Sequence, residues 1–173
     1  MWLGMVTHFR YSGPPAESGP DQSRHDGPID VQLVYSRDGH TWSRLEDRSP
    51  VIPNGPHQYD AGCILGVANT PVSAGDETWL YYTAITTTHG GYTPKKKITI
   101  ARAAWRRHGW VSLDAGTAGG TIETTPLLAG GQRLSVNAEA IGGELKAAIL
   151  NTEGSPIRGY GLEDCLPITG NGV

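Results

Sequence analysis

The chain has 173 residues, of which 24 are glycine and 12 are proline, so these two residue types make up about a fifth of the sequence. That share lies below the ~25–30 % that indicates low-complexity disorder, and a net charge of only −3 also favours a folded chain. The sequence has no excess of basic residues and no apolar run of the ~20 residues that a membrane helix needs. We therefore expect neither nucleic acid nor a membrane as a partner.

Apolar and polar residues alternate with a period of two along much of the chain, which predicts β-strands. In residues 29–35 the apolar side chains of Ile29, Val31, Leu33 and Tyr35 fall on one face. Many short strands predict an all-β protein of the sandwich, barrel or propeller type, and only residues 99–107 would also fit a short helix. The other candidate strands cover residues 2–10, 78–86, 97–105, 110–113, 121–128, 133–140 and 144–151.

Two segments do not fit strands. Residues 12–28 are polar and rich in proline and glycine, and they exceed the ~12–15 residues of an ordinary loop, so they predict an exposed connection or a functional loop. Residues 48–62 contain three prolines but also His57, Tyr59 and Asp60. Because binding and catalytic residues often lie on loops, this second segment is the first candidate for a functional site.

A weak internal repeat relates residues 35–45 to residues 104–113. Arg-Asp-Gly at 37–39 corresponds to Arg-His-Gly at 107–109, and a tryptophan follows each glycine. In both copies we expect a tight turn with positive φ and a return strand that begins at the tryptophan. Asp38 is then a turn residue rather than an acid or base. The period of 70 residues suits a four-stranded propeller blade with long loops.

Several short motifs, in their order along the chain, resemble the five-bladed propeller glycosidases of glycoside hydrolase families 32, 43, 62 and 68. The similarity is greatest to a poorly characterised bacterial subgroup of the family 32 type. In that subgroup an aspartate is usual where this chain has His108. The motifs are Ser-Arg-Asp-Gly-His-Thr-Trp at 36–42, Tyr-Asp-Ala-Gly at 59–62, Trp-Leu-Tyr-Tyr at 79–82, His-Gly at 89–90, and the segments 107–116, 134–138, 142–145 and 164–168.

This resemblance implies an all-β fold with about two blades of a five-bladed β-propeller in residues 1–113. A partial C-terminal β-sandwich would follow in residues 114–173. Five four-stranded blades do not fit in the first 113 residues, so the resemblance also implies that the chain is one part of a longer protein. Sheet edges would then be unpaired, and unpaired edges favour self-association.

The resemblance also implies a carbohydrate-active protein, a glycoside hydrolase acting on an oligosaccharide or polysaccharide. Asp60 would be a catalytic carboxylate at the start of an inner strand, and His89, Tyr82 and His57 would contact the substrate. We expect Asp60 and His89 to face one shared cleft. Hydrolysis needs two carboxylates, and the resemblance implies that the second belongs to an absent blade, so the isolated chain is expected to be inactive.

Other interpretations of these residues stay open. Asp60 also fits a turn or strand cap, Tyr82 a core residue and His89 an exposed loop residue. The chain would then be a non-catalytic carbohydrate-binding module or a structural piece of a propeller.

The remaining candidates for chemistry are weak. Cys63 and Cys165 lack the spacing of a zinc site, and we expect two free, buried thiols. Glu123 and Asp164 are expected to be structural. We expect no metal and no cofactor, and the sequence does not indicate a cellular compartment.

Overall fold

The computed structural model describes residues 1–17, 19, 22–128, 130–131 and 133–172. About 40 % of the chain is strand and 4 % is helix, which confirms the predicted all-β class. The chain forms two compact units, unit 1 (Met1–Trp105) and unit 2 (Arg106–Val173). The described strands close neither a barrel nor a propeller ring. Among the described residues, no helix is long and apolar enough to cross a bilayer.

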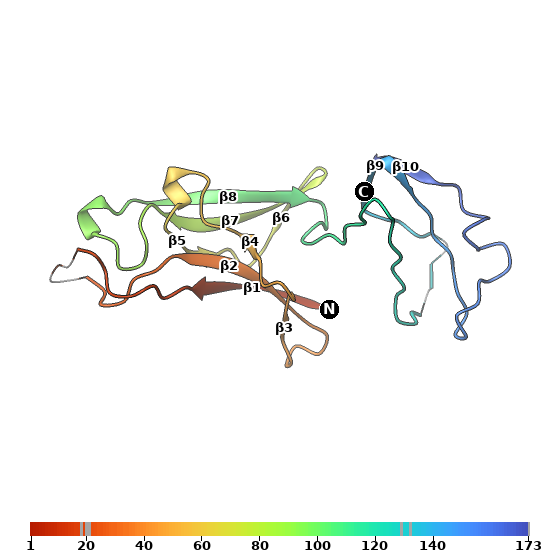
Figure 1. Cartoon of the computed structure of the whole chain (residues 1–173), viewed down its shortest axis with the longest axis horizontal. Coiled ribbons are helices and arrows are strands. Elements are labelled where there is room, and N and C mark those ends of the chain that lie inside the picture. The colour runs from red at the N-terminus through yellow and green to blue at the C-terminus, as the bar shows by residue number, and fades with distance from the viewer. Residues whose placement is uncertain (18, 20–21, 129, 132, 173) are drawn as a thin grey trace. The chain divides into compact units, whose positions relative to one another are not determined.

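The described part of unit 1 contains eight strands and two short 3₁₀ helices (Figure 1). In chain order these are β1 (Trp2–Phe9), β2 (Ile29–Ser36), β3 (Ser43–Arg44), β4 (Pro50–Ile52), η1 (Gln58–Asp60), β5 (Cys63–Val67), β6 (Val72–Ala74), β7 (Glu77–Ile85), η2 (Thr93–Lys95) and β8 (Ile98–Arg106).

Two antiparallel halves make up this sheet. In the first half, β2 pairs with β1 from Trp2↔Ser36 to Phe9↔Ile29, and it also pairs with β3 and β4. In the second half, β7 pairs with β5, β6 and β8. A single parallel pair, Ile29↔Cys63, joins β2 to β5. Figure 1 shows β1 and β2 in one layer and β7 and β8 in a second layer.

The core of unit 1 lies between these layers, because both halves contribute to one apolar cluster. Its buried members are Val31, Ile52, Ile64, Leu80, Tyr82 and Ala84. Ile29, Val31 and Leu33 are at most 5 % exposed, so the apolar face predicted for residues 29–35 is confirmed at these positions. Apolar residues of β8 also pack against this cluster, which confirms the strand predicted there in place of the short helix.

The turn at Asp38 is built as predicted. One carboxylate oxygen of Asp38 accepts hydrogen bonds from the backbone N–H groups of His40 and Thr41 and from the Ser36 hydroxyl. These bonds, from Thr41 first, hold the pKa of Asp38 well below its usual range. Gly39 has a φ of +79°, and Trp42 directly precedes β3. Asp38 therefore stabilises a turn.

Unit 2 has less regular structure than the sequence predicts. Its described residues contain β9 (Ala138–Leu145) and β10 (Ile168–Gly172), which pair antiparallel, and a few isolated bridges. The strands predicted at 110–113 and 121–128 are wrong, and the strands predicted at 133–140 and 144–151 overlap β9 only in part. The return strand expected after Trp110 is therefore missing, and the positive φ lies at His108 rather than at Gly109.

These errors have a common physical reason. Period-two alternation specifies a strand only where a neighbouring layer covers the apolar face. The side chains of Val111, Leu113, Ile122 and Leu127 are between 53 % and 78 % exposed, so their segments gain little stability from strand pairing.

Both cysteines are free thiols, as predicted. Cys63 is buried, as predicted, but Cys165 is only partly buried, contrary to the prediction.

Gly62, just before β5, offers a direct test of this packing. A Cβ atom at Gly62 would lie 1.9 Å from the backbone carbon of Thr87, whereas one at Gly66 would meet nothing closer than 3.9 Å. We predict that Gly62→Ala lowers the free energy of unfolding by more than about 2 kcal/mol, because the backbone has to move, and that Gly66→Ala changes it by less than about 1 kcal/mol. Urea titration followed by tryptophan fluorescence measures both, and equal effects would contradict this packing.

Candidate functional site

Asp60 lies at the end of η1, so the prediction that it begins an inner strand is wrong. Its backbone N–H donates to the carbonyl of His57, and its own carbonyl accepts from the N–H of Gly55. Pro53 and Pro56 lie between β4 and this short helix, and neither has an N–H group with which to extend the strand ladder. The side chain turns inward and is only 2 % exposed.

Tyr82 on β7 is the partner of this carboxylate. Its hydroxyl donates to Oδ2 of Asp60 at 2.9 Å, and the Tyr82 ring belongs to the apolar core. Oδ1 of Asp60 is buried without a hydrogen-bond partner among the described residues. Burial raises the pKa of Tyr82 well above its usual range, and the hydrogen bond and the charge of Asp60 raise it further. Tyr82 is therefore a core residue whose hydroxyl group binds the Asp60 carboxylate.

The other residues of η1 face the surface. The rings of His57 and Tyr59 are stacked, with centroids 5.0 Å apart and planes inclined by 11°, and Tyr59 is 38 % exposed. Tyr59 and Gln58 line a hollow of about 600 Å³, together with Thr86, Lys95 and residues 97–101. We call this hollow the η1 groove. It offers an aromatic ring, an amide, hydroxyl groups and ammonium groups to a ligand.

His89 has a different set of contacts. Its backbone N–H donates to the carbonyl of Gly27, and its ring Nδ1 lies 3.2 Å from the carbonyl oxygen of His25. The centroid of its ring lies 5.1 Å from the centroid of the Phe9 ring. Of the interactions among the described residues, none joins His89 to Asp60. The shared cleft expected for these two residues therefore stays a prediction.

Asp26 holds this second loop in place, and the sequence analysis did not single it out. Its Oδ1 accepts hydrogen bonds from the N–H groups of Gly27 and Gly90. Partial burial raises the pKa of Asp26, but hydrogen bonds from the Thr88 side chain and from these two N–H groups outweigh it, so the pKa is lowered. The Asp-Gly-Pro sequence at 26–28 is typical of turns, so the sequence did contain a signal for a turn held by Asp26. In the segment 12–28, residues 18, 20 and 21 lie outside the described residues.

A second buried carboxylate, Asp30, lies on β2 and was also missed. Asp30 is 2 % exposed and forms an ion pair with Arg10, and its Oδ1 lies 3.7 Å from Nδ1 of His8. Gln32 continues this polar network, because its amide contacts His8 at 3.2 Å and accepts from Arg44 at 2.5 Å. A charged residue within an apolar alternation was the signal for this network. The ion pair makes Asp30 structural in this arrangement.

Cys63 is unsuited to nucleophilic chemistry. Burial raises the pKa of its thiol to about 11, so the thiolate is scarce at neutral pH. Within the described ranges, no group of three His, Cys, Asp or Glu side chains is placed to hold a metal ion.

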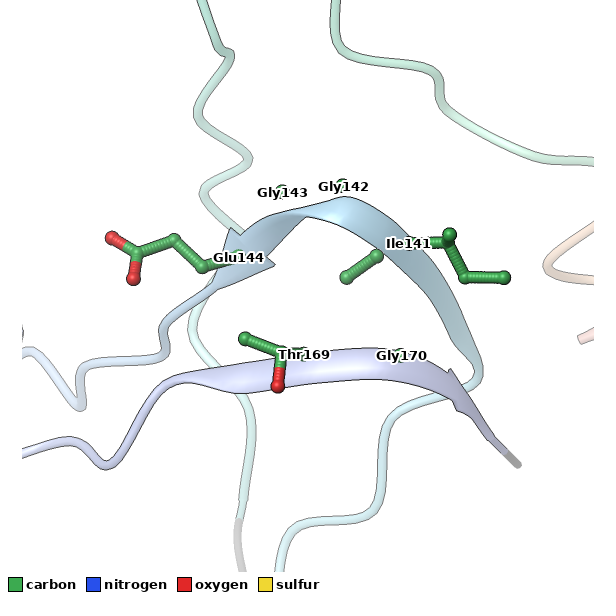
Figure 2. Close-up of a pocket in the computed structure, with 7 residues that line it drawn as sticks. Ile141, Gly142, Gly143, Glu144, Thr169 and Gly170 are labelled. Carbon is green, nitrogen blue, oxygen red and sulfur yellow. The ribbon is translucent and has the colours of Figure 1, made fainter.

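Unit 2 has a hollow of its own, of about 580 Å³, between β9 and β10. Figure 2 shows β9 arching over it near Gly142 and Gly143, with the Glu144 carboxylate directed away from the hollow. Polar side chains do not converge on this hollow, so the η1 groove is the stronger candidate site.

Comparison with known proteins leaves the chemistry of the η1 groove as the guide to function. No family model, no curated protein and no solved structure matches the chain.

The bond between Tyr82 and Asp60 can be tested on stability. Tyr82→Phe removes the hydroxyl and leaves a buried carboxylate without a donor, so we predict a loss of about 1.5–3 kcal/mol in the free energy of unfolding. Tyr81→Phe, on the same strand but 41 % exposed, is the control and should change it by less than about 0.5 kcal/mol. A Tyr82→Phe variant as stable as the wild type would show that this hydrogen bond is absent.

The raised pKa of Cys63 predicts a dependence on pH. The thiol of Cys63 has a pKa near 9.0 in the unfolded chain and near 11 in the folded chain. The contribution of the protonated thiol to the free energy of unfolding is therefore fully present below pH 9 and is lost as the pH rises through 11. We expect the free energy of unfolding to fall less steeply over this range in Cys63→Ala than in Cys165→Ala. Urea titrations at several pH values measure the two slopes, and equal slopes would contradict the shift.

Proposed function

We propose that unit 1 binds carbohydrate at the η1 groove. The observation that carries this proposal is the stacked and exposed pair of His57 and Tyr59, because Tyr59 also lines the groove. A ring face beside a few polar groups suits a sugar, which has apolar C–H faces and hydroxyl groups. The amide of Gln58 supplies both a donor and an acceptor.

The resemblance of the chain to propeller glycosidases supports the same substrate class. Under this proposal the two antiparallel halves of unit 1 are two blade-like sheets, and residues 114–173 are part of a sandwich module. The packing of both halves around one apolar cluster supports the first of these statements. Self-association through unpaired edges, and contacts of Tyr82 and His89 with a sugar, stay predictions.

Glycoside hydrolysis is the second candidate function. The unpartnered Oδ1 of Asp60 favours it, because a carboxylate with a free oxygen can exchange a proton with a substrate. The mechanism needs a second carboxylate across the scissile bond. Among the described residues the other buried carboxylate, Asp30, is paired with Arg10, and Asp60 itself is only 2 % exposed. Binding without hydrolysis therefore has the stronger support.

Substitution of the aromatic residue tests the binding function. We predict that Tyr59→Ala weakens the binding of oligosaccharides at least about tenfold, which corresponds to about 1.4 kcal/mol, because the stacking surface is lost. Isothermal titration calorimetry against a panel of neutral and acidic oligosaccharides measures this. Tyr160→Ala, an exposed tyrosine of unit 2, is the matched control and should bind like the wild type.

Two outcomes separate the candidates. Binding without release of reducing sugar supports the binding function, whereas hydrolysis that is abolished in Asp60→Asn supports the second candidate. If no oligosaccharide binds, or if Tyr59→Ala binds as tightly as the wild type, the proposal is wrong.

A further inference from the structure

A cationic segment borders the η1 groove. Lys95, Lys96 and Lys97 follow one another in a chain whose net charge is −3, and Lys95 and Lys97 line the groove. None of the residues that line it is acidic. The groove therefore has a positive charge that no lining carboxylate offsets, which favours an anionic ligand.

The three lysines differ in their partners. Nζ of Lys95 lies 3.0 Å from a carboxylate oxygen of Glu17, and Nζ of Lys96 donates to the carbonyl of His89 at 3.2 Å. Within the described part of the chain, the ammonium group of Lys97 has neither an ion pair nor a hydrogen bond. Lys97 is thus the cation that remains available to a ligand.

The backbone of Lys97 is held in place although its side chain is exposed. Its N–H donates to the Thr86 hydroxyl at 3.0 Å, and its carbonyl accepts from the N–H of Thr86 at 3.1 Å. Lys97 therefore lines the groove from a fixed position directly before β8, and the exposed residues Ile98 and Ile100 of β8 line it too. Tyr59 and Gln58 line the same groove.

Resting on the proposed function, we propose that the η1 groove selects acidic carbohydrates. The sugar ring stacks on Tyr59, and an anionic group of the sugar pairs with the ammonium group of Lys97. A carboxylate, as in a uronic acid, and a sulfate share the chemistry that this lysine recognises. A volume of about 600 Å³ lies within the ~300–1,000 Å³ typical of small-ligand sites.

Calorimetry with a trisaccharide of galacturonic acid and with its methyl ester tests this selection. Esterification removes the charge and keeps the rings, so we expect the acid to bind at least about twofold more tightly. Lys97→Gln should weaken binding of the acid about two- to fivefold more than it weakens binding of the ester. Lys146→Gln, an exposed lysine of unit 2, is the control and should have no effect.

Salt gives a readout that does not depend on any variant. The preference of the wild type for the acid should shrink at 1 M salt, where the screening length is about 3 Å. Equal affinities for acid and ester, or a preference that salt and Lys97→Gln leave unchanged, would overturn the acidic selection while the proposed function stands. If neither of these sugars nor any other oligosaccharide binds, the proposed function is wrong as well. A sulfated neutral trisaccharide that binds more tightly than the acid would assign the anion as sulfate.

Discussion

The hydrogen bond from the Tyr82 hydroxyl to the Asp60 carboxylate fixes the short helix η1 against strand β7. A carboxylate that is 2 % exposed is costly unless a donor compensates it, so this bond determines whether η1 can turn Asp60 inward. With Asp60 turned inward, Gln58 and Tyr59 stay at the surface and line the η1 groove. The position of the candidate site therefore depends on a contact made in the core.

Two further carboxylates of unit 1, the buried Asp30 and the partly buried Asp26, stabilise its strands and loops. Asp30 is paired with Arg10 of the segment that follows β1, and Asp26 accepts two backbone N–H groups that hold the His89 loop. One face of β2 thus carries polar side chains with partners, while the other face packs into the apolar core. Asp30 and Asp26 are therefore structural, and the groups available to a ligand lie on the surface of η1.

The four long strands of unit 1, β1, β2, β7 and β8, could be predicted from the sequence, because their patterns are local. The short strands β5 and β6 were missed, and the expectation that residues 48–62 contain no strand was wrong, because β4 pairs with β2 there. The alternation in residues 29–35 and the turn at Asp38 each specify structure within a few residues. Tyr82 and Asp60 are 22 residues apart, and no local pattern predicts that they meet. In unit 2 the alternation at 110–113 and 121–128 was present without a covering layer, so it predicted strands that the structure lacks.

Amide chemical-shift mapping of the ¹⁵N-labelled protein with the galacturonic acid trisaccharide tests the central claim most directly, because it locates the bound sugar. Sugar bound at the η1 groove should shift the amides of residues 57–59, Thr86 and residues 97–101, and should leave those of β9 and β10 unchanged. Shifts confined to unit 2, or to the loop around His89, would contradict this account of where the protein binds its ligand.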